Sequence, residues 1–206
     1  MPSTDPLSKL TAADISKKLA VPHPNHLVER FPLEMLQGEP KPAAVLIPFL
    51  KQASNWHILF TRRTDTLPEH SGQVAFPGGR ADPEDSTPEF TALREAEEEI
   101  GLNPDDVLLL GRLDSMITIS NYRLTPVVGV IPWPYSFRLA RHEVSRVFTI
   151  PLAWLADSAN HEIQERELPA PYGTVPVIYF SRYENELLWG VSAQIMLNLL
   201  RALNIA

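Results

Sequence analysis

The stretch GGRADPEDSTPEFTALREAEEEIGL, residues 78–102, decides how we interpret the rest of this chain. From Pro88 onward its composition favours a helix, with Pro88 suited to the first turn and Gly101 to a stop just past the end. At about 100° per residue, one side of this helix is acidic and a separate side is apolar. The acidic side carries Glu95, Glu98 and Glu99, and the apolar stripe carries Leu93, Ala96 and Ile100.

These acids lie at positions where they do not stabilise an isolated helix. Glu95 and Glu99 are like charges four residues apart, and Glu98 and Glu99 lie in the last turn, where the helix dipole favours cations. A sequence that violates a local rule without a local gain commonly does so at a functional site. Because carboxylate oxygens suit hard divalent cations, the stretch predicts a metal site on this helix.

Composition limits the number of domains and the classes of partner. The 206 residues, 44% hydrophobic and 21% charged, are enough for one well-buried domain. We therefore expect a single domain over residues 1–206, with residues 1–42 as a helical and irregular extension packed on it. The net charge of -7 argues against sequence-independent binding of nucleic acid, which needs an excess of Lys and Arg.

The chain contains no cysteine, which excludes disulfides, a thiol nucleophile and thiolate metal sites. Its first residues lack the apolar core of a signal peptide, and no run approaches the ~18 apolar residues of a membrane span. We therefore expect a cytoplasmic protein that makes no use of a membrane.

Elsewhere in the chain, apolar runs with polar breaks predict strands, and two segments have helical spacing. We expect a short helix over residues 10–19 and a C-terminal helix within residues 187–205. The expected strands are 43–50, 56–63, 73–76, 107–119, 122–132, part of 142–157 and 176–180, with a Pro-Gly-Gly turn at 77–79 and a short helix from Pro151. Strands with a central and a closing helix indicate an α/β (α+β) fold, in which a mixed β-sheet lies between helices.

The acidic helix and the residues before it resemble the signature of the Nudix hydrolases. The second half of that signature matches residue for residue over REAEEEIGL, residues 94–102. In the first half, Asp85 stands where the signature has a Glu, and one extra residue precedes Arg94. The resemblance implies a Nudix-type α/β/α sandwich and a diphosphatase that acts on phosphoric anhydrides with Mg²⁺ or Mn²⁺.

A longer resemblance, over roughly residues 43–200, is to the coenzyme A diphosphatase branch of this family. The segments LFTRRT (59–64) and GQVAFPGG (72–79) match that branch closely. One position departs from the pattern: the second basic residue of the branch motif is Pro68 here. In the family this basic residue belongs to the coenzyme A recognition motif, so the departure concerns the substrate more than the reaction.

The resemblance also implies which residues hold the metal. Glu95, Glu98 and Glu99 would bind Mg²⁺ or Mn²⁺, with the carbonyl oxygen of Gly79 as an extra candidate ligand. Arg94 lies beside the acidic side and would orient the glutamates through ion pairs. Glu95, Glu98 and Arg94 are also candidates for the catalytic set, because the bound cations would clamp the diphosphate and activate a water.

Candidate substrate contacts precede the helix. Arg62 and Arg63 end a predicted strand, and because side chains alternate along a strand, one of the two should point into the site. Arg63 matches the branch motif and is our choice for a phosphate contact. Gly78 lets the backbone approach a ligand closely. Glu143 is a candidate general base, with a solvated surface charge as the alternative interpretation.

The branch resemblance implies hydrolysis of coenzyme A or its derivatives to 4'-phosphopantetheine and adenosine 3',5'-bisphosphate. The nearest alternatives are Nudix diphosphatases acting on ADP-ribose, NADH or another nucleotide. A non-catalytic nucleotide-sensing module is a more remote alternative, because the chain keeps all the signature glutamates. A serine hydrolase is excluded because this chain has no Gly-x-Ser-x-Gly motif. The expected partner is a small-molecule nucleotide, and a homodimer is a further option.

Overall fold

A computed structural model describes residues 6–22, 38–66, 70–168 and 173–205, and Pro68 lies outside them. The helices, including short 3-10 turns labelled η, are η1 (Pro6–Lys9), α1 (Ala12–Leu19), α2 (Pro88–Ile100), η3 (Pro104–Asp106), α3 (Leu152–Ala156), η4 (Ser158–Asn160) and α4 (Gly190–Ala202). The strands are β1 (Lys41–Gln52), β2 (Asn55–Arg63), β3 (Val74–Ala75), β4 (Gly78–Arg80), β5 (Leu108–Arg112), β6 (Met116–Ile117), β7 (Tyr122–Val130), β8 (Val144–Pro151), β9 (His161–Leu168) and β10 (Gly173–Phe180).

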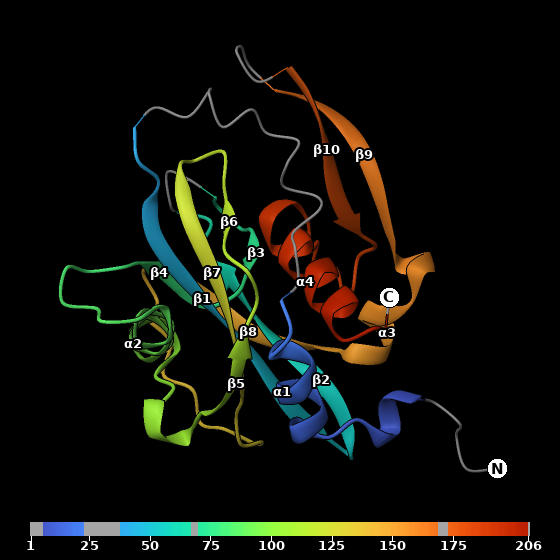
Figure 1. Ribbon diagram of the computed structural model, residues 1–206. Helices are drawn as coiled ribbons and strands as arrows, with labels where there is room; N and C mark the ends of the chain where they lie inside the picture. Colours follow the sequence, from blue (N-terminus) through green and yellow to red (C-terminus); the bar gives the residue numbers. More distant parts are fainter. Residues whose placement is uncertain (1–5, 23–37, 67–69, 169–172, 206) are drawn as a thin grey trace.

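A mixed sheet forms the centre of the molecule, with β3, β2, β1, β7 and β5 side by side in that order (Figure 1). The central strands β1 and β7 run parallel, from the pair Lys41↔Tyr122 to the pair Phe49↔Val130. The pairs β1–β2, β1–β4, β2–β8 and β5–β7 are antiparallel. A separate two-stranded ribbon, β9–β10, extends beyond the main sheet in Figure 1.

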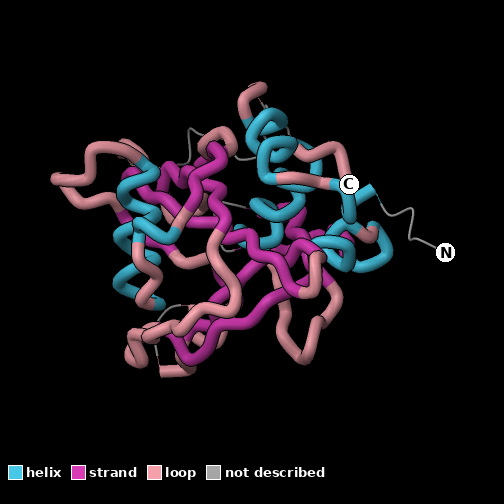
Figure 2. Tube along the Cα trace, turned by 90° about the horizontal axis from the view of Figure 1, so that it is seen from below, coloured by secondary structure: helices cyan, strands magenta, loops and turns pink. Residues whose placement is uncertain are grey.

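Helices cover both faces of this sheet, as the view along it in Figure 2 shows. On β1, Ala44, Leu46 and Leu50 belong to the apolar cluster that includes Ala92, Ala96 and Ile100 of α2. The alternate residues Ile47 and Phe49 belong to the larger cluster on the opposite face, together with side chains of α1, α3 and α4. Because both faces of β1 are buried, its sequence is a continuous apolar run. The predicted α/β/α sandwich with a mixed sheet is confirmed.

The predicted acidic helix is confirmed with its bounds. Pro88 is the first residue of α2, and Thr87 caps it by accepting a hydrogen bond from the Phe90 N–H. Gly101 ends the helix in the left-handed conformation, with φ 68°, which favours glycine. The strand pair over 43–50 and 56–63 is also confirmed, as antiparallel β1 and β2.

Several expected boundaries differ from the structure. The Pro-Gly-Gly turn is a short strand, β4, which pairs with β1 through Val45↔Gly78. The strand expected over 107–119 is divided into β5 and β6, which both pair with β7. The sequence pattern also missed β9, because this strand is largely exposed and mostly polar and therefore lacks an apolar signal. In the described residues, no helix is both long and apolar enough to cross a membrane.

Candidate active site

The backbone of β4 lies against the C-terminal half of α2. The N–H of Gly78 donates a hydrogen bond to Glu99 Oε2, at 3.3 Å. At Gly79, a Cβ atom would lie 2.5 to 2.7 Å from the carboxyl atoms of Glu95. Gly78 has φ 155°, and a Cβ there would collide with the carbonyl oxygen of Ala44. The missing side chain of Gly79 therefore lets β4 approach the helix and its carboxylates, whereas that of Gly78 lets β4 approach β1.

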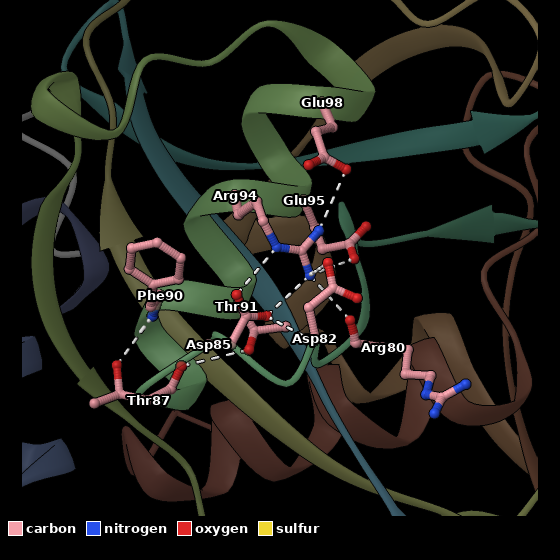
Figure 3. Close-up of polar contacts among 9 residues, drawn as sticks. All are labelled: Arg80, Asp82, Asp85, Thr87, Phe90, Thr91, Arg94, Glu95 and Glu98. Carbon is pink, nitrogen blue, oxygen red and sulfur yellow. Dashed lines mark hydrogen bonds and ion pairs between the residues drawn. The ribbon is translucent and has the colours of Figure 1, made fainter.

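Arg94 is the centre of a network of ion pairs on the same helix (Figure 3). Its guanidinium lies 2.9 Å from Asp85 Oδ2, 2.9 Å from Glu95 Oε1 and 3.3 Å from Glu98 Oε2. It also donates a hydrogen bond to the carbonyl of Arg80, at 3.0 Å. The hydrogen bond to Asp85 is the main cause of the raised pKa of Arg94. One side chain thus contacts two of the predicted metal ligands and β4, which is the geometry that an orienting role requires.

Asp85, which replaces the signature Glu, is the strongest partner of Arg94. Its side chain is only 2% exposed and accepts two hydrogen bonds from Arg94, at 2.9 and 3.2 Å. The N–H of Asp82 donates a third bond, at 3.0 Å. The Arg94 hydrogen bonds are the main reason that the pKa of Asp85 falls to about 2. Asp85 therefore fastens the loop before α2 to the helix, a contact that the sequence interpretation had left unassigned.

Glu99 is a buried acid, and no cationic side chain of the described residues lies at hydrogen-bond distance from it. The residue is 6% exposed, and burial is the main reason that its pKa rises to about 8. The nearby charges of Glu95 and Glu143 raise this pKa further, whereas the Gly78 N–H and Arg63 lower it. Glu95 also has a raised pKa, caused first by burial, and Glu143 is again among the like charges responsible. Arg63 and Glu143 therefore lie near enough to the acidic end of α2 to influence its carboxyl groups, and their roles stay predictions.

Comparison with known proteins identifies the family of this chain. Residues 40–170 match the family model described as the NUDIX domain, which is more than half of the chain. The chain belongs to the Nudix hydrolase family. This Nudix hydrolase is a pyrophosphohydrolase, and members of the family generally use divalent metal ions.

Individual relatives have the same family name. A Yersinia pestis (strain Pestoides F) protein described as "Uncharacterized Nudix hydrolase NudL" is 42% identical over 165 residues, which cover 79% of this chain and 80% of that protein. Among solved structures, the Nudix hydrolase RenU of M. smegmatis is 21% identical, with a TM-score of 0.49 over 59% of this chain and 76% of that chain. The Ap4A hydrolase of C. elegans is 20% identical, with a TM-score of 0.47 over 53% and 80%. The names of these relatives identify the Nudix family, and none of them mentions coenzyme A as a substrate.

The three signature glutamates of this Nudix hydrolase differ in exposure more than the helical pattern predicted. Glu98 has a side chain 61% exposed, Glu95 has one 16% exposed, and Glu99 is buried. Glu99 follows Ala92 by two helical turns and therefore lies close to the apolar stripe. The interpretation that all three acids are presented together on a free side is wrong for Glu99, which points into the packed interface with β4.

The two arginines at the end of β2 lie in different surroundings. Arg62 pairs with Asp65 at 2.7 Å and lies 3.6 Å from Glu186. Arg63 instead influences the pKa of Glu99, and its buried Nε atom has no hydrogen-bond partner in the described part of the chain. The expectation that one of the two arginines points into the site stays a prediction. The substrate roles of both arginines stay predictions.

The donor set suits a hard cation. Over the described ranges, no three carboxylate or histidine side chains are grouped closely enough to enclose an ion, and the Glu95 and Glu98 carboxylates contact Arg94. Burial is the first cause of the raised pKa values of Glu95 and Glu99, and neighbouring carboxylates raise both further, so a bound cation would favour the ionised form of each acid. Carboxylate oxygens are the ligands that Mg²⁺ and Mn²⁺ prefer. The residues present therefore fit a divalent cation.

Proposed function

We propose that this Nudix hydrolase cleaves the diphosphate of coenzyme A or its derivatives, giving 4'-phosphopantetheine and adenosine 3',5'-bisphosphate. One observation carries the proposal. The two segments that resemble the coenzyme A branch both act on Glu99: the charge of Arg63, from the first segment, lowers its pKa, and the N–H of Gly78, from the second, donates a hydrogen bond to it. A motif whose separate parts converge on one carboxylate is expected to act at that place.

In this proposal, the acids of α2 form the metal centre. Glu95, Glu98 and Glu99 would hold Mg²⁺ or Mn²⁺, with the carbonyl of Gly79 as an additional ligand. When bound, such an ion stabilises charge on the diphosphate oxygens and lowers the pKa of a water. The contacts of Arg94 with Glu95 and Glu98 support its role in holding these carboxylates in position.

The remaining roles concern the substrate and the attacking water. Arg63 would contact a phosphate, because a guanidinium suits phosphate oxygens and its buried Nε atom has no hydrogen-bond partner among the described residues. Gly78 would allow the diphosphate to approach the backbone, and Arg62 would contribute charge at the rim. Glu143, whose side chain is 42% exposed, would accept a proton from the water that attacks phosphorus. Its electrostatic coupling to Glu95 and Glu99 supports this assignment.

A second candidate is a Nudix diphosphatase for ADP-ribose, NADH or another nucleotide. The observation that favours it is Pro68, which occupies the position of a basic residue in the coenzyme A motif. In either case the partner is a small-molecule nucleotide. The cytoplasmic location, the homodimer and the single domain over residues 1–206 stay predictions from the sequence.

Product analysis tests the proposal. The purified protein is incubated with coenzyme A, ADP-ribose or NADH, with Mg²⁺ or Mn²⁺, and the products are identified by liquid chromatography and mass spectrometry. We expect 4'-phosphopantetheine and adenosine 3',5'-bisphosphate from coenzyme A, with the highest kcat/KM of the panel. Much faster cleavage of ADP-ribose or NADH would replace coenzyme A with the second candidate.

A further inference from the structure

Thr64 joins the end of β2 to the segment that carries Glu143. Its backbone N–H donates to the carbonyl of Glu143 at 2.9 Å, and its hydroxyl donates to the carbonyl of His142 at 3.2 Å. Thr64 is 8% exposed, and it lies 78 residues before His142 in the chain. The two hydrogen-bond donors of this buried residue therefore bind the carbonyl oxygens of two consecutive residues, one of which is the proposed general base.

Ser145 makes the reciprocal contact from the other strand. Its hydroxyl donates to the carbonyl of Arg62 at 2.9 Å and has a longer contact, 3.4 Å, with the carbonyl of Arg63. The β2–β8 ladder shifts register at this point, because Arg62 pairs with Arg146 whereas Arg63 pairs with Val144. Ser145 is the extra residue of this bulge. Bulges change the direction of side chains and are frequent beside active sites.

We propose that Thr64 and Ser145 are positioning residues, which hold Glu143 and Arg63 in register with each other and opposite Glu99. The proposal rests on the proposed function, in which Glu143 is the general base and Arg63 contacts phosphate. The Glu143 side chain is 42% exposed and contacts the neighbouring His142 at 3.4 Å. Its place therefore depends on the backbone, which Thr64 holds directly.

Thr64→Val tests the first half of the proposal, because it removes the hydroxyl and preserves the shape of the side chain. The assay uses whichever diphosphate the wild-type protein cleaves. We expect kcat to fall about tenfold with KM nearly unchanged, since small displacements of a reacting group cost this much or more. Thr64→Ser keeps the hydroxyl and should recover most of the activity. An unchanged kcat in Thr64→Val would overturn the proposal.

A double-mutant cycle separates positioning from general weakening of the fold. If Thr64 acts through Glu143, Thr64→Val should change kcat less than about twofold when Glu143→Gln is already present. The same tenfold loss in both backgrounds would overturn the positioning role. Full activity of Glu143→Gln would remove the general base from the proposed function, and Thr64 would lose its target with it. An impaired Glu143→Gln beside a fully active Thr64→Val would make the positioning role alone wrong.

Thr149→Val is the matched control, because it makes the same change on β8 at a residue whose hydroxyl accepts from the Gln52 side chain at 2.9 Å. It should lower the melting temperature comparably and leave kcat unchanged. Ser145→Ala, at a half-buried position, gives a second test if Thr64→Val folds poorly. It should lower kcat/KM about fivefold through Arg63, with little further loss in an Arg63→Gln background. Equal losses in both backgrounds would contradict the role of Ser145.

Discussion

Asp85 and Glu99 are two shielded carboxylates beside the same helix, and the structure affects them in opposite ways. The Asp85 side chain is 2% exposed, and hydrogen bonds from Arg94 lower its pKa to about 2. Glu99 is 6% exposed, and burial raises its pKa to about 8. Asp85 has a guanidinium 2.9 Å away, whereas Glu99 has one backbone N–H at 3.3 Å. The described part of the chain therefore supplies a guanidinium to Asp85, whereas Glu99, a proposed metal ligand, has only a backbone N–H at hydrogen-bond distance.

The largest expected effect is the loss of activity in Glu99→Gln. If Glu99 is a metal ligand, the amide should lower kcat by about 100-fold or more in Mg²⁺ or Mn²⁺, because it cannot supply the negative charge that holds the cation. Steady-state kinetics measure this. Glu97→Gln, the same change at an exposed position of α2, serves as the control and should keep wild-type activity. A Glu99→Gln enzyme as active as the control would remove Glu99 from the metal site.

The same substitution should stabilise the protein when no divalent ion is present. The pKa of Glu99 is 4.5 ordinarily and about 8 when folded, so between these pH values only the folded chain keeps the proton. Wild-type stability therefore falls as the pH rises from about 4.5 to about 8. We expect Glu99→Gln to be more stable than wild type by about 2 to 4 kcal/mol at pH 8, and equally stable near pH 4.5. Urea unfolding in the presence of a chelator measures both values, and a difference independent of pH would contradict the prediction.

Asp85→Asn should have the opposite and smaller effect. The pKa of Asp85 is lowered from 3.8 to about 2, so its ion pair stabilises the fold above pH 3.8, and this contribution is lost as the pH falls towards 2. The variant should lose about 1 to 2 kcal/mol at pH 7, less at pH 3, in urea unfolding experiments. Asp82→Asn is the matched control, because Asp82 is 60% exposed and 3.9 Å from Arg94. A similar loss in both variants would show that Asp85 has no special place in the network.

Much of α2 could be predicted from the sequence, because its signals are local. Pro88 and Gly101 fix the two ends through backbone chemistry, and the periodicity of the apolar residues fixes the packed side. The burial of Glu99 was not predicted, since it depends on how closely β4 approaches. That approach requires Gly78 to pair with Val45, more than thirty residues earlier in the chain.

The positions of Arg63 and Glu143 were harder to predict from the sequence. Resemblance favoured Arg63 as a phosphate contact, whereas strand alternation alone left Arg62 and Arg63 as equal candidates. Glu143 was a candidate general base with a solvated surface charge as the alternative. The bulge at Ser145 separates the surroundings of the two arginines, and a bulge has no reliable signature in a single sequence. The contacts of Thr64 with residues 142 and 143 are likewise tertiary and become visible only when β2 and β8 are paired.

The direct contact between β4 and α2 also bears on the extra residue that precedes Arg94. Gly78 contacts Glu99, Gly79 contacts Glu95, and the carbonyl of Arg80 accepts from Arg94. These contacts fix the strand and the helix to each other directly, and Asp85 in the connecting loop over residues 81–87 adds one further anchor to Arg94. Because the strand and the helix hold each other directly, we expect the extra residue before Arg94 to leave the positions of Glu95 and Glu99 unchanged.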